Sequence, residues 1–140
     1  MSRSRAGGFT VLELVVVLGL VAVLLGLAFS SWRGHVAQQR LRYGTVQVAT
    51  GLRQAQERAK EARVPYTVTF TAGSAAYRIA GGGFVENATM PEGVTAVVDD
   101  VVTFSAFGQP DAAHTITLRN SSGDGTVTVN ATGGISYQTP

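Results

Sequence analysis

The stretch GFTVLELVVVLGLVAVLLGLAF, residues 8–29, decides the architecture of this chain. About 20 apolar residues at a helical rise of about 1.5 Å reach roughly 30 Å, the thickness of the hydrocarbon core of a bilayer. The stretch therefore predicts a helix that is able to span a membrane. One charged side chain, Glu13, lies inside it, where an unpaired carboxylate costs on the order of a few kcal/mol. Glu13 is a candidate functional residue; the alternative is a glutamate that reaches water at the lipid headgroups.

The residues before the apolar stretch differ from those of a classical signal peptide. Residues 1–8 form a short basic leader that ends in glycine, whereas a signal peptide carries its small-residue cleavage site after the apolar core. Cleavage after the core, in the segment Ala28-Phe29-Ser30, is an alternative that would make the chain an ordinary secreted or anchored β domain. That alternative leaves Glu13 unexplained.

The motif GFTVLE, residues 8–13, resembles the processing motif of the type IV pilins and of the pseudopilins of type II secretion. The resemblance implies that a prepilin peptidase cuts between Gly8 and Phe9, and that the new amine of Phe9 is N-methylated. It also implies that the Glu13 carboxylate meets the N-terminal ammonium of a neighbouring subunit in a filament. Opposite charges attract strongly in low dielectric and each is penalised alone, so such a pair favours assembly and register.

The helical period continues beyond the apolar stretch. Small and apolar residues recur at spacings of three and four, which indicates one face of an amphipathic helix. These are Leu41, Thr45, Val48, Leu52, Ala55, Ala59 and Ala62. Gly34, Gly44 and Gly51 interrupt the pattern and are expected to be soft points, and Pro65 is expected to end the helix. We expect a helix over residues 9–63, with 9–30 in the membrane and 31–63 as an amphipathic stem.

From Tyr66 onward the pattern alternates with a period of two, which is typical of strands. Expected strands lie at residues 66–71, 76–79, 84–85, 94–98, 101–104, 115–119, 126–129 and 135–137, with a flexible break at 81–83 and turns at 91–93 and 121–125. Residues 64–140 are therefore expected to form an antiparallel β-sheet head with room for one small core. The fold class is α+β, and the resemblance implies the type IV pilin-like fold, in which the long N-terminal helix packs on that sheet.

Charge is distributed unevenly along the chain. Seven basic side chains accompany Glu57 and Glu61 in residues 30–63: Arg33, Arg40, Arg42, Arg53, Arg58, Lys60 and Arg63. Residues 64–140 carry Arg78 and Arg119 against six acidic side chains: Glu86, Glu92, Asp99, Asp100, Asp111 and Asp124. A basic stem therefore supports an acidic head, which does not favour DNA binding by the head. We expect the stem arginines to face anionic lipid or the acidic heads of neighbouring subunits.

The exported part of the chain resembles the GspH/FimT-type minor pseudopilins. The resemblance lies in residues 53–60 and in the later pattern VTF, FG and GGI, which includes Phe107-Gly108. This resemblance implies a low-copy subunit that helps to start or cap the pseudopilus of a type II secretion system. Its expected partners are the prepilin peptidase, other major and minor pseudopilins and inner-membrane lipid, with secreted proteins as further candidates. The protein would cross the bacterial inner membrane once, with its C-terminal domain in the periplasm and then in the pseudopilus. A minor pilin of a type IV pilus, serving assembly, motility, adhesion or DNA uptake, is the alternative.

Other chemistry receives little support from the sequence. The chain has no cysteine and two histidines, His35 and His114, so a zinc site would need carboxylates from distant segments. Calcium at Asp99-Asp100 or Asp124 is a less favoured alternative, because isolated aspartates in turns more often accept local backbone hydrogen bonds. No nucleophile stands beside a base in the pattern. We expect no enzymatic activity, no metal and no cofactor.

Overall fold

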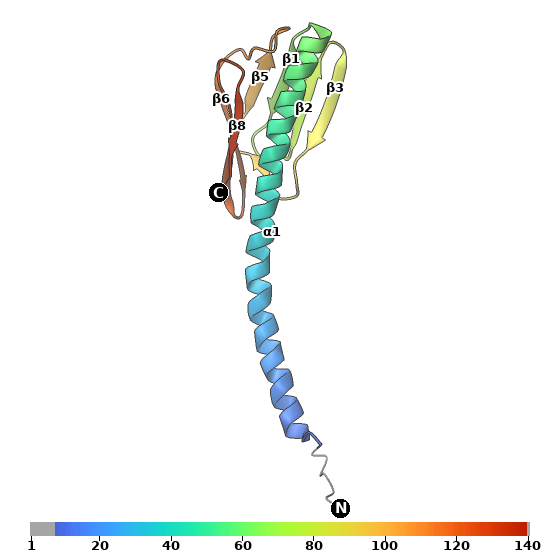
Figure 1. The fold of residues 1–140 in the computed structure, drawn as a ribbon, viewed down its shortest axis with the longest axis vertical. Coiled ribbons are helices and arrows are strands. Elements are labelled where there is room, and N and C mark those ends of the chain that lie inside the picture. Colours follow the sequence, from blue (N-terminus) through green and yellow to red (C-terminus); the bar gives the residue numbers. More distant parts are fainter. Residues whose placement is uncertain (1–7, 140) are drawn as a thin grey trace, which may run out of the picture. The chain divides into compact units, whose positions relative to one another are not determined.

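The computed structural model describes residues 8–139, and residues 1–7 of the expected leader lie outside this range. The chain divides into two compact units, Met1–His35 and Val36–Pro140. One helix, α1 (Val11–Ala62), contributes to both units. Eight strands follow: β1 (Tyr66–Phe70), β2 (Ala76–Gly81), β3 (Phe84–Thr89), β4 (Thr95–Ala96), β5 (Asp100–Phe104), β6 (His114–Asn120), β7 (Gly123–Val129) and β8 (Ile135–Gln138). The expected long helix followed by an antiparallel β domain is confirmed (Figure 1).

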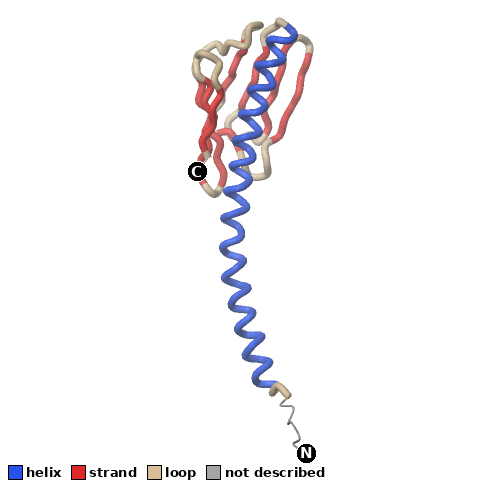
Figure 2. Tube along the Cα trace, viewed as in Figure 1, coloured by secondary structure: helices blue, strands red, loops and turns tan. Residues whose placement is uncertain are grey.

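The strands form two antiparallel sheets of four strands each, where the sequence pattern suggested one. The first sheet has the order β3-β2-β1-β5 and the second the order β4-β6-β7-β8. Within the second unit, Figure 2 shows strands on both sides of the C-terminal part of α1, with β2 and β3 on one side and β6 and β8 on the other, as labelled in Figure 1. The core of this unit therefore lies where α1 meets both sheets.

The predicted stripe on α1 supplies the helical side of that core. Six of its seven members have no exposed surface: Leu41, Thr45, Val48, Leu52, Ala55 and Ala59. The strands supply alternating inward residues, such as Val68 and Phe70 on β1. Full burial of a Leu or Val side chain contributes roughly 1.5–3 kcal/mol, so this stripe holds the unit together. The seventh member, Ala62, is exposed at the last residue of the helix.

Two of the three glycines that were expected to be soft points on α1 are close-packing positions. A methyl group on Gly44 would lie 3.1 Å from a side-chain methyl of Val94, and one on Gly51 would lie 2.8 Å from the hydroxyl oxygen of Tyr77. Gly34 has nothing within 4 Å of the same position. Gly44 and Gly51 therefore allow the strands and loops to approach the helix backbone at two points, seven residues apart.

The turn between β2 and β3 also differs from the expectation of a flexible break. Gly81 pairs with Phe84, and Gly82 and Gly83 between them adopt φ values of +57° and +84°. Two residues with positive φ are the requirement of a tight hairpin turn whose twist matches the strands. The three glycines thus make a defined turn, and β3 extends to Thr89, well past the two residues that alternation indicated.

Polar side chains fasten α1 to loops of the sheets. The Gln56 side-chain amide donates to the carbonyl oxygens of Gly108, at 2.7 Å, and Gly133, at 3.0 Å. The Arg53 guanidinium donates to the Ile135 carbonyl at 3.0 Å. These bonds satisfy backbone acceptors that the strands leave unpaired and orient the loops around the helix.

We expect Gly51→Ala to destabilise the second unit. The new methyl group must displace the Tyr77 ring, which is 4% exposed and stacked on Phe70 at 5.4 Å between ring centroids. Overpacking costs about 1–3 kcal/mol, which exceeds the gain of up to about 1 kcal/mol in helix propensity. Urea unfolding of the full chain in detergent micelles measures this difference. Gly34→Ala is the matched control and should be neutral or stabilising; equal stability of Gly51→Ala and wild type would contradict the packing argument.

Candidate functional site

The predicted site residues Gly8, Phe9 and Glu13 lie at the N-terminal end of α1. Gly8 and Phe9 precede the helix, and the Phe9 side chain is 83% exposed. Thr10 caps the helix, because its hydroxyl oxygen accepts a hydrogen bond from the Glu13 backbone N–H at 3.2 Å. The Leu14 N–H then donates to the Thr10 carbonyl at 3.1 Å, which closes the first turn.

Glu13 occupies the third helical position, where an acidic side chain is favourable for a reason independent of any partner. The N-terminus of a helix carries a partial positive charge, and a carboxylate in the first turn contributes about 0.3–1 kcal/mol. Threonine followed three residues later by glutamate is the sequence signal of a capping box. The charge of Glu13 was recognised from the sequence, whereas the cap formed by Thr10 was missed although this signal was present.

The apolar stretch behind Glu13 is not covered by those residues of its own unit that the structure describes. Its large apolar side chains between Val11 and Phe29 are 44–80% exposed. The helix includes an 18-residue window with a mean hydropathy of 2.8 and none of it buried. By length and composition this helix is able to cross a membrane, which matches the expectation from the sequence. Burial of this surface needs a bilayer or another protein.

The end of the apolar stretch carries side chains that are typical of a membrane–water boundary. Trp32, the single tryptophan of the chain, is 73% exposed and is followed by Arg33. With Leu25, Ala28 and Phe29 it lines a shallow apolar groove on the helix. Trp side chains concentrate at the headgroup level, and basic residues near helix ends extend to the same level.

The basic stem forms ion pairs within its own chain, and the expected pairing of its upper arginines with neighbouring heads stays a prediction. The Arg40 guanidinium lies 3.3 Å from the Glu92 carboxylate, and the Arg58 guanidinium lies 2.9 Å from that of Glu86. Arg58 also stacks over the Phe84 ring at 4.3 Å from its centroid. Surface pairs of this kind contribute at most about 1 kcal/mol each.

The acidic residues considered for calcium have separate partners. Asp99 accepts a hydrogen bond from the Ala72 N–H at 2.7 Å. Asp124, on β7 in the other sheet, forms two hydrogen bonds with Arg119, at 2.6 and 2.8 Å. Asp100 accepts from the His114 ring. Within residues 8–139, no three histidine, aspartate or glutamate side chains are arranged as a metal-binding group.

These features define an α+β protein in which one long N-terminal helix packs on antiparallel sheets. Two crystal structures of the type IV minor pilin FimU of Pseudomonas aeruginosa are similar to it. One has a TM-score of 0.58 at 15% sequence identity, and the match covers 71% of this chain and 89% of the chain in that crystal structure. The other has a TM-score of 0.56 at 16% identity, with 70% and 92% covered. The chain thus has the type IV pilin-like fold. No protein-family model and no curated protein sequence matches it.

We expect Trp32 to lie at the headgroup level when the full chain is reconstituted in lipid vesicles. Quenching of its fluorescence by lipids brominated at graded depths should be strongest for the shallowest label. The paired variant Phe29→Trp/Trp32→Phe moves the indole three residues along the helix, about 4.5 Å deeper, and should shift the maximum to a deeper label. Equal quenching of both proteins at all depths would show that this segment does not insert.

Proposed function

We propose that this protein is a subunit of a filament of the type IV pilin class, anchored in the bacterial inner membrane before assembly. The observation that carries the proposal is the uncovered apolar segment of α1 in a chain whose second unit has the pilin-like fold. Residues 9–30 would lie first in the bilayer and later among the helices of neighbouring subunits. Residues 64–140 would form the exported head, with residues 31–63 as the stem.

The chemistry at the N-terminus supports assembly as the role of Glu13. Cleavage between Gly8 and Phe9 by a prepilin peptidase would create a new ammonium group, and N-methylation of Phe9 would leave it positively charged. A glutamate and an ammonium from adjacent subunits would neutralise one another in the apolar interior of the filament. Breaking a buried pair by removing one partner costs about 3–5 kcal/mol, so the pair would select the correct register.

For the particular system, we propose a minor pseudopilin of type II secretion, acting at the tip or during initiation of the pseudopilus. The support is the resemblance of the exported domain to the GspH/FimT type. Its partners would be other major and minor pseudopilins, with secreted proteins as further candidates. DNA is disfavoured as a partner, since the head has more acidic than basic side chains.

A minor pilin of a type IV pilus is the second candidate, and a specific observation favours it. Both similar crystal structures are of a type IV minor pilin. At 15–16% identity this likeness concerns the fold, which both systems use. Deletion of the gene separates the candidates: loss of secreted enzymes with normal twitching and transformation would support secretion, and the reverse would support the pilus.

We expect mass spectrometry of the protein purified from its native membrane to find an N-terminal peptide that begins at N-methylated Phe9. Gly8 precedes the helix, and nothing lies within 4 Å of the position that a Cβ atom would take there. This open space suits access by a peptidase. An intact Met1, or a start after Ser30, would overturn the filament proposal and indicate an anchored or secreted β domain.

We expect Glu13→Gln to lower incorporation into filaments by about tenfold or more while the protein remains in the membrane. Glutamine can still serve in the capping box, so this variant removes the charge and keeps the helix start. A loss of a few kcal/mol in a buried pair corresponds to such a factor. Immunoblots of sheared filaments and of membranes measure the two pools.

Glu61→Gln, at an exposed position near the other end of α1, is the matched control for Glu13→Gln and should assemble normally. Glu13→Ala tests the added contribution of the cap. Normal incorporation of both Glu13 variants would exclude a charge pair at this position.

A further inference from the structure

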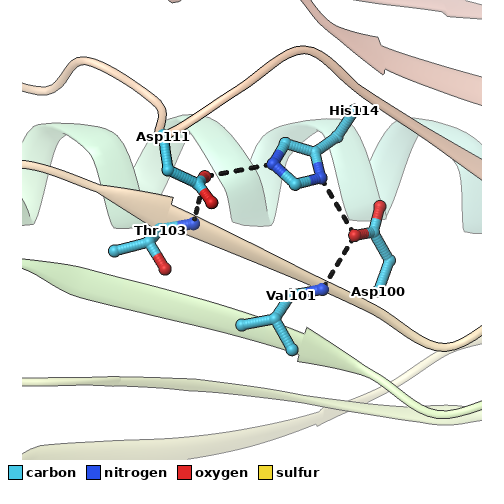
Figure 3. A network of polar contacts seen from close by, with 5 residues as sticks. All are labelled: Asp100, Val101, Thr103, Asp111 and His114. Carbon is cyan, nitrogen blue, oxygen red and sulfur yellow. Dashed lines mark hydrogen bonds and ion pairs between the residues drawn. The ribbon is translucent and has the colours of Figure 1, made fainter.

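A cluster of three ionisable side chains joins the two sheets of the head. His114, the first residue of β6, lies between Asp100, the first residue of β5, and Asp111, in the connection between these strands (Figure 3). The ring atom Nδ1 is 2.9 Å from Asp100 Oδ1, and Nε2 is 3.0 Å from Asp111 Oδ1. The His114 side chain is 13% exposed. Because β5 and β6 belong to different sheets, the ring bridges them.

The backbone of β5 holds both carboxylates in place. Asp111 Oδ1 accepts from the Thr103 N–H at 3.0 Å, and the Asp111 N–H donates to the Thr103 carbonyl at 2.9 Å. Asp100 Oδ1 accepts from the Val101 N–H at 2.8 Å (Figure 3). The two carboxylates are therefore directed at the ring from opposite sides, and they cannot converge on a common metal ion.

This geometry specifies the protonation state of the ring. Ionised carboxylates only accept hydrogen bonds, and neutral imidazole has a single N–H to donate. Both contacts of His114 are satisfied only when the ring carries two protons and a positive charge.

We propose that His114 is a pH-responsive clasp: as an imidazolium it fastens the connection between β5 and β6 to β5 and joins the two sheets, and loss of a proton releases one carboxylate. The connection also carries Phe107, whose ring is 84% exposed. It is held as a tight turn by hydrogen bonds from the Gly108 N–H to the Ser105 carbonyl and from the Ser105 N–H to the Gln109 carbonyl, both 2.8 Å. The clasp and the exposed Phe107 therefore lie on the same connection between β5 and β6.

The charged surroundings of His114 determine the direction of its response. Burial alone lowers the pKa of His114, but the hydrogen bonds and charges of Asp111 and Asp100 outweigh it and raise the pKa above the ordinary value. On β7 the opposing residue is Val129, which is uncharged. Burial alone raises the pKa of Asp111, and the Thr103 N–H and His114 outweigh it and lower the pKa.

The sign of the pH dependence follows from these two shifts. A raised His114 pKa means that its contribution to stability is complete below about pH 6.5, the unfolded value, and is lost as the pH rises through the folded value. A lowered Asp111 pKa means that its contribution is present above about pH 4 and is lost as the pH falls through the folded value. The clasp is therefore closed in mildly acidic solution, and it opens as the pH rises through the folded-state pKa of His114.

NMR titration of the full chain in detergent micelles tests the clasp directly. The chain has two histidines, so His35→Gln assigns the His114 ring signal. We expect the His114 midpoint to lie above 6.5, and Asp111→Asn or Asp100→Asn to lower it by about one unit or more. Amide exchange of Asp111 should accelerate, beyond the general base-catalysed rise, as the pH passes the His114 midpoint.

Asp124→Asn is the control, because Asp124 pairs with Arg119 near the other end of the strand and should leave the His114 midpoint unchanged. The titration of the wild-type protein keeps the test decisive even if a substitution impairs folding. A wild-type midpoint at or below 6.5, or an unmoved midpoint in both Asp100→Asn and Asp111→Asn, would overturn the proposal. An amide exchange rate of Asp111 that shows no extra rise at the His114 midpoint would also overturn it.

Discussion

The close approach of α1 to two sheets is the constraint on which the second unit depends. Where α1 comes closest to its neighbours, glycine leaves the needed space: Gly51 faces Tyr77 on β2, and Gly44 faces Val94 in the connection between β3 and β4. The larger side chains of the stripe, such as Leu41 and Leu52, then fill the space between these points and have no exposed surface. The free energy gained from this burial holds the C-terminal part of the helix against the strands. The same helix continues into a segment whose apolar surface its own unit leaves uncovered.

Periodicity in the sequence predicted most of this arrangement, because it reports which residues share a face. The change at Tyr66 from a helical to an alternating period marks the first strand, and the stripe on α1 is confirmed at six of seven positions. Periodicity does not report what lies opposite a face. Gly51 therefore suggested weakness, when its value is the space it leaves for Tyr77. The sequence did not reveal that the eight strands divide into two sheets, because strands of both sheets show the same alternation of buried and exposed residues.

The site was predictable to the extent that its signals are local. Glu13 was identified as an isolated charge in an apolar run, and the Thr10 cap was present as a local spacing that was not used. The contact of His114 with Asp100 spans 14 residues and two sheets, so it depends on how the sheets pack. The pairing of Arg40 with Glu92 is hidden for the same reason. Long-range polar contacts follow from the fold and cannot be read before it.

Charged and apolar surfaces are distributed differently along this chain. Arg40 and Arg58 already have acidic partners in their own chain, and exposed pairs of this kind contribute little to the free energy of association. Much of the charge on the head is therefore already paired, which leaves exposed apolar side chains such as Phe107 for contacts with other molecules. The apolar segment supplies a large, general driving force for leaving water, and it is common to any membrane anchor. In the proposed filament, the Glu13 carboxylate would add a choice of register to that general force, because a matching positive charge would remove the cost of burying it.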